Sequence, residues 1–269
     1  MRLPLRARYN GGIAADGKLP LYDGTTSIQG VAQAVQIATH ALLTKTIVTR
    51  ATAARSADFY LMPSRSGSYL IELAAYIEAN PAVAGITAPI FYDWIKTIFT
   101  KATRRAPAEP ETPKVIRWME RDEPFLDELA ETLEGSLQRV HRPIGTEVTT
   151  ITFERPRSEL LTLNAHTKAW VNTRDVASDS TPFTGNVTRF NSITRNGRIF
   201  IDQLSRVIPF KPDGDFAMGG LQYLTWSLHG STNDLPKSLS LHAREVKSAT
   251  EETKRLLLVD CTRLDPAAA

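Results

Sequence analysis

Residues 185–210 read GNVTRFNSITRNGRIFIDQLSRVIPF, and this stretch decides the fold of the last third of the chain. Apolar and polar residues alternate through it in three short runs, which is typical of strands with one buried face. Asn196-Gly197 stands between the first two runs. It predicts a two-residue hairpin, because both residues tolerate the positive φ that such turns need. Pro209 interrupts the third run and indicates an edge strand or a bulge, since proline has no N–H to give to a sheet.

The segments that follow complete a small barrel. We expect a short helix over 221–228 and two more strands over 238–246 and 254–261. Three strands, one helix and two strands are the element order of an oligonucleotide/oligosaccharide-binding barrel, and an SH3-like barrel fits nearly as well. The sequence therefore predicts a small five-stranded β-barrel domain over 183–263, with a tail at 264–269.

The preceding residues, 1–176, have the mixed pattern of an α+β domain. Residues 3–9 alternate apolar and basic side chains, as a half-buried strand does. Residues 57–62 and 68–74 flank a turn-rich connection and predict a hairpin. Apolar residues recur on both faces of that hairpin, so we expect it to be central and covered. Further strands are expected at 147–153 and 160–163, with a short helix at 165–172.

Three longer helices are expected in the same domain. The first runs from a capping box at Thr26 to about Thr44, because its apolar residues recur at i, i+3, i+4 and i+7. The second covers 86–101, and the third runs from 115 to about 141 with a pause at Pro124. Three prolines within 106–113 predict an extended linker inside this domain.

Composition narrows the class of protein. The net charge is only +3 over 269 residues, and 42% of the residues are hydrophobic, as in ordinary globular proteins. The sequence contains no apolar run long enough to span a membrane, and its first residues do not resemble a secretory signal. Cys261 is the single cysteine, so no intramolecular disulfide can form, and we expect a buried thiol and a cytoplasmic location.

Most familiar catalytic motifs are absent. There is no phosphate-binding loop, no G-x-G-x-x-G, no H-E-x-x-H and no G-x-S-x-G. The histidines and the cysteine form no local cluster, so neither a metal site nor a cofactor is expected. Asp213-Gly214-Asp215 is the one D-x-D sequence, and a solvated turn is the favoured interpretation.

The remaining candidate site is a surface of the barrel. Proteins that bind single-stranded nucleic acid combine a basic groove with aromatic side chains on which bases stack. The barrel segment interleaves basic residues with Phe190, Phe200 and Phe210, although the alternation favours core positions for Phe190 and Phe200. The predicted nucleic-acid-binding residues are Arg189, Arg195, Arg198, Arg206, Lys211, Arg244 and Lys247.

Two stretches resemble a family of uncharacterised bacterial proteins, a domain of unknown function. One is YDGTTSIQG at 22–30, with the helix that continues to His40-Ala41-Leu42; the other is GNVTR at 185–189, followed by GRIFI at 197–201. The resemblance implies a bacterial protein associated with antiviral defence and implies no catalytic residues.

Three hypotheses for function follow. The first is a non-enzymatic adaptor subunit of a bacterial defence system, with a protein partner or a homo-oligomer and a barrel that engages nucleic acid or another ligand. The second is an enzyme of the hydrolase or nuclease class, with a site assembled from Asp23, Asp58, His166, Asp213 and Asp215. The third is a self-associating structural protein that uses the helical leucines of 115–142, although packing of that helix on its own domain is favoured.

Overall fold

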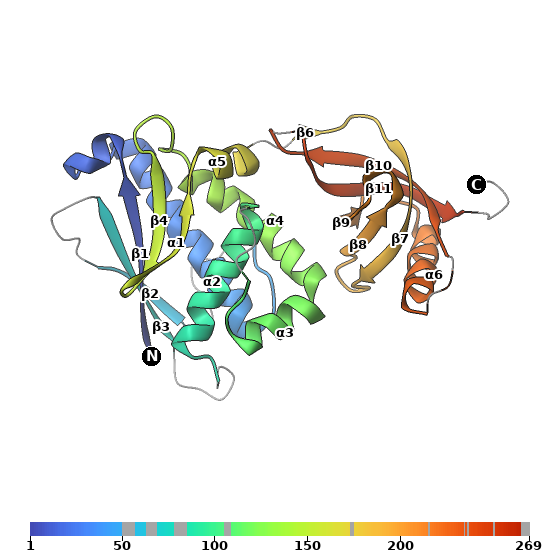
Figure 1. Ribbon diagram of the computed structural model, residues 1–269, viewed down its shortest axis with the longest axis horizontal. Coiled ribbons are helices and arrows are strands. Elements are labelled where there is room, and N and C mark those ends of the chain that lie inside the picture. The colour runs from blue at the N-terminus through green and yellow to red at the C-terminus, as the bar shows by residue number, and fades with distance from the viewer. Residues whose placement is uncertain are drawn as a thin grey trace. The chain divides into compact units, whose positions relative to one another are not determined.

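The computed structural model describes residues 1–49, 57–62, 69–77, 85–104, 109–172, 175–214, 216–233, 235, 237–249 and 251–264. The expected turn at 63–67 and the first part of the expected linker, 106–108, lie outside these ranges. The chain divides into two compact units (Figure 1). The first contains Met1–Arg121 and Leu126–Asn172, and the second contains Asp122–Phe125 and Thr173–Ala269. No helix in the described part of the chain is long and apolar enough to cross a membrane.

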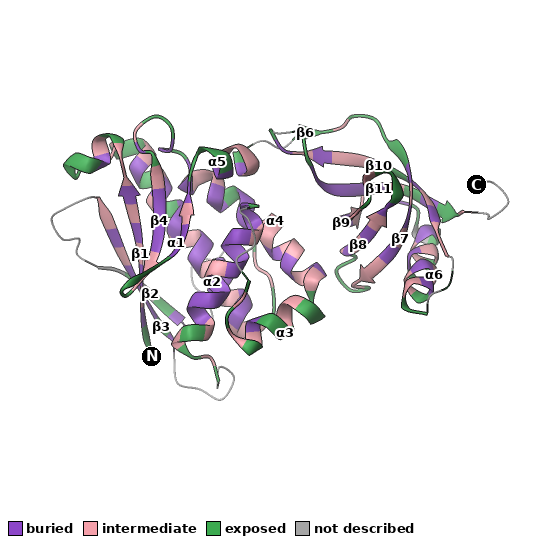
Figure 2. Cartoon of the chain, viewed as in Figure 1, coloured by how far each residue is buried: buried purple, intermediate pink, exposed green. Residues whose placement is uncertain are grey.

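The first unit is built on an antiparallel sheet with strand order β2-β3-β1-β4-β5. Its middle strand, β1, buries Leu3, Leu5, Ala7 and Tyr9 and turns the alternate residues outward (Figure 2). The expected hairpin exists, but its central position was wrong, because β2 is an edge strand and Tyr60 on it is exposed. The strands are β1 (Arg2–Asn10), β2 (Ala57–Met62), β3 (Leu70–Ile77), β4 (Thr150–Arg155) and β5 (Ser158–Leu163).

The helices of the first unit bury the apolar faces that their periodicity predicts. Leu126, Leu129, Leu133 and Leu137 of α4 are all fully buried, so this face packs within its own domain. The helix α1 begins at Leu21, one turn before the expected capping box, with Asp23 in its first turn near the positive end of the helix dipole. The helices are α1 (Leu21–Thr44), α2 (Ala88–Ala102), α3 (Pro113–Arg121), α4 (Glu123–Val140) and α5 (Ala165–Asn172), with a short 3₁₀ turn η1 (Gly12–Asp16).

Helices α1 and α4 cross at Gly30. A Cβ at this position would come within 2.7 Å of the carbonyl oxygen of Ser136 and of the backbone nitrogen of Val140. Only glycine therefore allows this close approach. At the same crossing the hydroxyl of Ser27 donates a hydrogen bond to the Val140 carbonyl, at 2.7 Å. The C-terminal half of α4 is thus held in a fixed position on α1.

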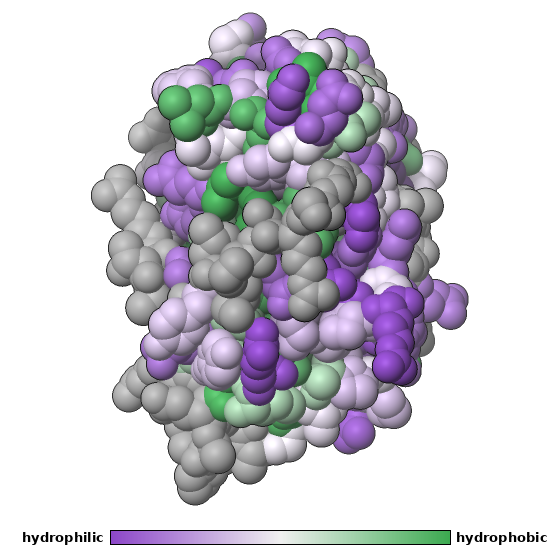
Figure 3. Space-filling model, turned by 90° about the vertical axis from the view of Figure 1, so that its left-hand side faces the viewer, coloured by the Kyte–Doolittle hydropathy of each residue, from purple (hydrophilic) through white to green (hydrophobic). Residues whose placement is uncertain are grey.

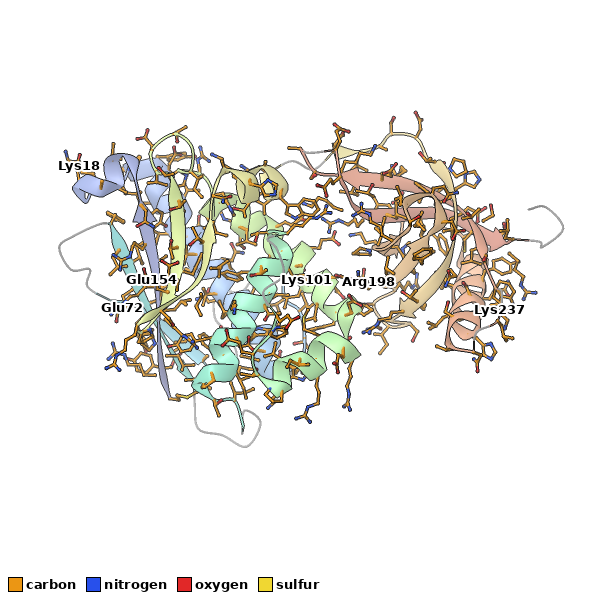
Figure 4. The ribbon with its side chains drawn as sticks, viewed as in Figure 1. Lys18, Glu72, Lys101, Glu154, Arg198 and Lys237 are labelled. Carbon is orange, nitrogen blue, oxygen red and sulfur yellow. The ribbon has the colours of Figure 1, made fainter. Side chains whose placement is uncertain are left out.

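The polar face of the first sheet is organised by ion pairs. Arg6 Nε donates to a Glu72 carboxylate oxygen at 3.0 Å, and Arg8 Nε donates to Glu154 at 2.7 Å. Figure 4 labels Glu72 and Glu154 on these strands. Figure 3 shows hydrophilic side chains spread over this side of the molecule between smaller hydrophobic areas. These pairs match charges across neighbouring strands, as expected for a solvated sheet face.

The second unit contains a closed five-stranded barrel. Its strands follow the order β11-β9-β8-β7-β10, and β10 pairs with β11 to complete the ring. All pairs are antiparallel except β9 with β11. A three-strand meander, a helix and a parallel pair between the third and fifth strands give the Greek-key closure of the oligonucleotide/oligosaccharide-binding barrel, which distinguishes it from the SH3-like alternative. The elements are β6 (Asp175–Val176), β7 (Thr181–Phe190), β8 (Gly197–Ile201), η3 (Asp202–Leu204), β9 (Arg206–Pro212), η4 (Met218–Gly220), α6 (Leu221–Thr232), β10 (Leu239–Lys247) and β11 (Thr253–Arg263).

The connection between β7 and β8 is longer than the sequence predicted. The expected two-residue turn at Asn196-Gly197 is wrong, because β7 ends at Phe190 and Gly197 already belongs to β8. The side chain of Asn191 accepts hydrogen bonds from the backbone N–H groups of Ile193 and Thr194. This local turn, with Arg195 at a φ of 61°, ends the first strand early.

Pro209 lies on β9, a strand between β8 and β11, yet its missing N–H removes no hydrogen bond to β11. It pairs with Arg198 of β8, and the parallel pairing of β9 with β11 begins one residue later, at Phe210. β9 as a whole is therefore not an edge strand. At Pro209 itself, however, β9 has a paired neighbour on one side only, as at an edge.

Candidate functional site

The outer face of β8 and β9 carries aromatic and basic residues from the barrel segment that was predicted to bind nucleic acid. Along β8, Ile199 and Ile201 enter the core, while Arg198 and Phe200 alternate with them and face outward. Phe200 pairs across the strands with the exposed Val207 of β9, and Lys211 lies further along the same strand. In barrels of this type, the face of the second and third strands is the usual ligand surface.

Phe200 was expected in the core, and the structure corrects this. It is half-buried and is not a member of the core cluster, because the strand register places its neighbours Ile199 and Ile201 inside. Phe190 does pack against the core, as predicted, with its ring parallel to Phe210 and 6.0 Å from it. Phe200 is therefore the phenylalanine that lies on the outer face.

Two of the predicted basic residues share one carboxylate. Glu123 is the first residue of α4; by its contacts it belongs to the second unit, whereas α4 from Leu126 onward belongs to the first. One of its oxygens lies 2.5 Å from Nη1 of Arg198 and the other 3.5 Å from Nε of Arg189. Figure 4 labels Arg198 on β8.

Three more of the predicted residues have partners inside the barrel. Arg244 forms an ion pair with Asp213, and its guanidinium is the main reason that the pKa of that carboxyl lies below its usual range. Arg206 donates to the Thr253 carbonyl at 3.1 Å, and Lys247 lies 3.8 Å from Glu245. Arg206 thereby links β9 to β11, and the two carboxylates offset part of the positive charge of the barrel.

The loop between β7 and β8 presents the last basic candidate. Arg195 is exposed, and Ile193 two residues earlier is 91% exposed. This loop joins the first and second barrel strands, and such loops contact the ligand in barrels of this type.

A second aromatic and basic group, which sequence reasoning missed, lies on α6. The Arg263 guanidinium is 4.8 Å from the centroid of the Trp226 ring, and Lys237 Nζ is 5.4 Å from it. Lys237 also lies 2.9 Å from His229 Nδ1 and lines a polar cavity of about 410 Å³ between β7 and the end of α6. The i, i+3 spacing of Tyr223 and Trp226 could have indicated an aromatic face on this helix. The contact with Arg263 could not have been predicted, because Arg263 is distant in the sequence.

The residues proposed for an enzyme site do not form a metal-binding group. Asp23 pairs with Arg142 in the first unit, whereas Asp213 pairs with Arg244 in the second. Asp58 and His166 are exposed, and Asp215 is outside the described ranges. Within those ranges, no three His, Cys, Asp or Glu side chains lie close enough together to hold a metal ion.

Two potentially reactive side chains are buried and have structural roles. His141 is fully buried, with Nδ1 2.7 Å from the Leu137 carbonyl and Nε2 2.9 Å from the Thr167 hydroxyl. Burial lowers its pKa to about 4, so the ring is neutral and links α4 to α5. Burial also raises the pKa of Cys261 to about 12, and its thiol contacts the Gly220 carbonyl, which confirms the expected buried thiol.

Comparison with known families finds a match for the first unit. A family model described as a domain of unknown function, DUF7946, matches residues 5–172, which is more than half of the chain. Comparison with curated proteins and with solved structures found no match. The matched range includes the stretch at 22–30 and ends where the first unit ends, whereas the stretch at 185–201 lies outside it. The chain therefore belongs to the family described as domain of unknown function DUF7946.

Proposed function

We propose that this chain is a non-catalytic binding protein whose barrel takes single-stranded nucleic acid across the outer face of β8 and β9. The observation that carries the proposal is the outward-facing Phe200, with the basic Arg198 and Lys211 toward one end of the strands, on the second and third strands of a barrel of the oligonucleotide/oligosaccharide-binding type. A base can stack on an exposed aromatic ring whatever its identity, so such a surface needs no sequence preference.

The neighbouring residues supply the other contacts that a nucleotide strand requires. Arg198 and Lys211 both lie on one side of the apolar pair of Phe200 and Val207, toward the β7–β8 loop, and can reach phosphates there. Arg195 and Ile193 extend the surface onto the loop between β7 and β8. A strand bound here would stack one base on Phe200, with about 1–3 kcal/mol expected for each stacked base.

Glu123 modifies this surface. Its carboxylate occupies donors of Arg189 and Arg198 that a phosphate would otherwise accept from. A nucleic acid must exchange with this carboxylate, so binding will be weaker than the number of basic residues suggests. The exchange still favours a polyanion at low salt, because bound phosphates release their counterions.

Fluorescence anisotropy with labelled single-stranded DNA, single-stranded RNA and duplex DNA, at about 50 and 200 mM salt, tests the proposal. We expect both single strands to bind more tightly than the duplex, with affinity falling as salt rises. Phe200→Leu keeps an apolar residue but removes the aromatic ring and should weaken binding about tenfold. Lys211→Gln should weaken binding and flatten the salt dependence.

Lys237→Gln is the matched control, because Lys237 belongs to the same unit but lies beside α6. It should leave the affinity unchanged. Absence of binding to any strand at low salt would refute the proposal. A loss caused by Lys237→Gln without any effect of Phe200→Leu would move the binding surface to the aromatic group on α6.

A further inference from the structure

The family domain contains a basic cavity lined by its own residues alone. Its volume is about 450 Å³, and every lining residue comes from α4, the turn that follows it, or α5 of the first unit. Three of these residues are cationic and two carry amides. The lining residues are Gly135, Gln138, Arg139, Arg142, Lys168 and Asn172.

The spacing of these residues explains why they converge. Gly135, Arg139 and Arg142 lie at i, i+4 and i+7, which is one face of a helix, and Lys168 and Asn172 lie at i and i+4 on α5. The buried leucines of α4 occupy its opposite side and fix its rotation against the core. The link from His141 to Thr167 holds the two helices together beside the cavity.

Each cation is held in place by part of its donor set. Arg139 Nη2 donates to the side-chain oxygen of Gln33, and Arg142 Nε donates to Asp23 at 2.5 Å. Lys168 Nζ donates to the carbonyl oxygens of Arg142 and Ile144, at 3.2 and 2.5 Å. These anchors fix the side chains before any ligand arrives, which reduces the entropy lost on binding. Asp23 is the single carboxylate in these contacts, so the positive charge exceeds the negative charge.

Two features have no structural explanation without a ligand. Cations near the C-terminal end of a helix interact favourably with its dipole, and this accounts for the ammonium group of Lys168 beside the end of α4 and for Arg139 in its last turn. The dipole does not explain the Nε of Arg139, which is buried and has no hydrogen-bond partner among the described residues. A buried donor without a partner is costly, and an incoming acceptor would remove that cost.

The second feature is Gly135. A Cβ at this position would meet no atom within 4 Å, in contrast to Gly30, where it would meet the backbone of α4. Glycine in the middle of a helix is unfavourable unless something requires it. Packing requires it at Gly30, whereas at Gly135 the missing side chain leaves the cavity open.

We propose that this cavity binds an oxyanion, namely the phosphate or pyrophosphate group of a small phosphorylated ligand. Arg139 and Arg142 supply planar sets of donors that match such oxygens, and Lys168 adds a point charge. The amide of Gln138 already donates to the Val171 carbonyl at 2.6 Å, which leaves its oxygen for a hydroxyl of the ligand. A volume of about 450 Å³ is within the usual range for small-molecule sites.

Isothermal titration calorimetry of the full chain with inorganic phosphate, pyrophosphate and ATP tests the proposal. We expect pyrophosphate to bind more tightly than phosphate, with weaker binding at higher salt. Tighter binding of ATP than of pyrophosphate would identify a nucleotide as the source of the anion, and equal affinity would identify a free anion. Arg139→Gln should lower the pyrophosphate affinity at least about tenfold, because it removes charge-assisted hydrogen bonds.

Gly135→Gln and Gly135→Glu form a matched pair that changes no existing cation. Both fill the cavity and favour the helix, but only Gly135→Glu adds a negative charge. We expect Gly135→Glu to abolish binding and Gly135→Gln to weaken it less, with unchanged or higher thermal stability for both variants. The proposal is overturned if the folded wild-type chain binds none of the three anions, or if Arg139→Gln and Gly135→Glu bind as the wild type does.

The barrel variant Phe200→Leu separates this test from that of the proposed function. It should leave pyrophosphate affinity unchanged, since Phe200 belongs to the other unit. Conversely, Gly135→Glu should leave the affinity for single-stranded DNA unchanged.

Discussion

Two basic residues beside the cavity of the first unit and two of the barrel have different kinds of partners. In the family domain, Arg139 and Lys168 are held by a side-chain amide and by backbone carbonyls, and they keep their charge beside an open cavity. In the barrel, Arg198 and Arg244 are held by carboxylates, which offset that charge. A neutral acceptor positions a cation without cancelling its charge, whereas a carboxylate does both. The chemical nature of the partners therefore distinguishes a preformed anion site from a surface that must exchange partners.

Destabilising one unit while the other stays folded is the strongest test of this comparison. At Gly185 of β7, an added Cβ would lie 2.0 Å from the Phe200 carbonyl oxygen, which cannot move without opening the β7–β8 pair. Gly185→Ala should therefore destabilise the barrel by about 3 kcal/mol or more. Hydrogen exchange should show faster exchange in the barrel strands and unchanged protection in β1 and α1.

Gly214→Ala is the control for that experiment, since nothing lies within 4 Å of an added Cβ there. It should change stability by less than about 0.5 kcal/mol. Equal loss of protection in both units after Gly185→Ala would show that the two cores unfold as one.

The pH dependence of unfolding tests the buried link beside the cavity. The pKa of His141 is about 4 in the folded chain, against an ordinary value of 6.5, so the unfolded chain binds the proton first as pH falls. The free energy of unfolding should therefore decrease by about 3 kcal/mol between pH 6.5 and pH 4 from this residue alone. Urea unfolding at several pH values measures this decrease.

His141→Gln removes the titrating group, so the stability difference between wild type and variant should shrink as the pH falls through this range. His166→Gln alters an exposed histidine on α5 and should follow the wild-type pH dependence. If His141→Gln also followed the wild-type curve, the imidazole would not be neutral in the folded chain.

Gly30 of α1 and Gly135 of α4 give opposite predictions for the same change. Gly30→Ala should destabilise the domain by about 1–2 kcal/mol, because the added methyl group must push α1 away from α4. Gly135→Ala should stabilise it by about 0.5–1 kcal/mol, because the space is open and alanine favours the helix. Thermal unfolding of both variants checks this contrast, and destabilisation by Gly135→Ala would indicate an unrecognised packing role.

The smallest expected effect concerns the carboxylate on the barrel face. Glu123→Gln leaves Arg189 and Arg198 without their shared negative partner and should strengthen binding of single-stranded DNA about threefold at low salt. Asp260→Asn, an exposed carboxylate on β11, is the control and should change affinity less. Fluorescence anisotropy measures both, and weaker binding by Glu123→Gln would contradict a competitive role for this carboxylate.

Local patterns predicted the elements well where a single face is buried. The leucines of α4 and the alternating residues of β1 were recognised because helical and strand periodicities are properties of neighbouring residues. The order of strands and helix in the last third was sufficient for a five-stranded barrel. The length of the β7–β8 loop was not predicted, because the side chain of Asn191 forms a turn that competes with the Asn196-Gly197 signal.

The candidate sites were predicted less completely. The basic residues of the barrel were named from the sequence, but their carboxylate partners come from distant positions such as Glu123 and Asp213. The i, i+4 and i+7 spacing of Gly135, Arg139 and Arg142 places them on one helical face, but this spacing alone does not indicate a cavity. The convergence of these residues with Lys168 depends on how α5 packs beside α4, which no local pattern specifies.

The amino-acid sequence by itself determined which segments become helices and strands and which side of each is apolar, because these depend on spacings of two to four residues. Only the tertiary structure decided that β2 lies at an edge, that Phe200 faces outward, and which charged groups meet. Electrostatic neutralisation and cavity formation depend on distances between residues far apart in the chain. Those distances are fixed only when the helices and strands pack.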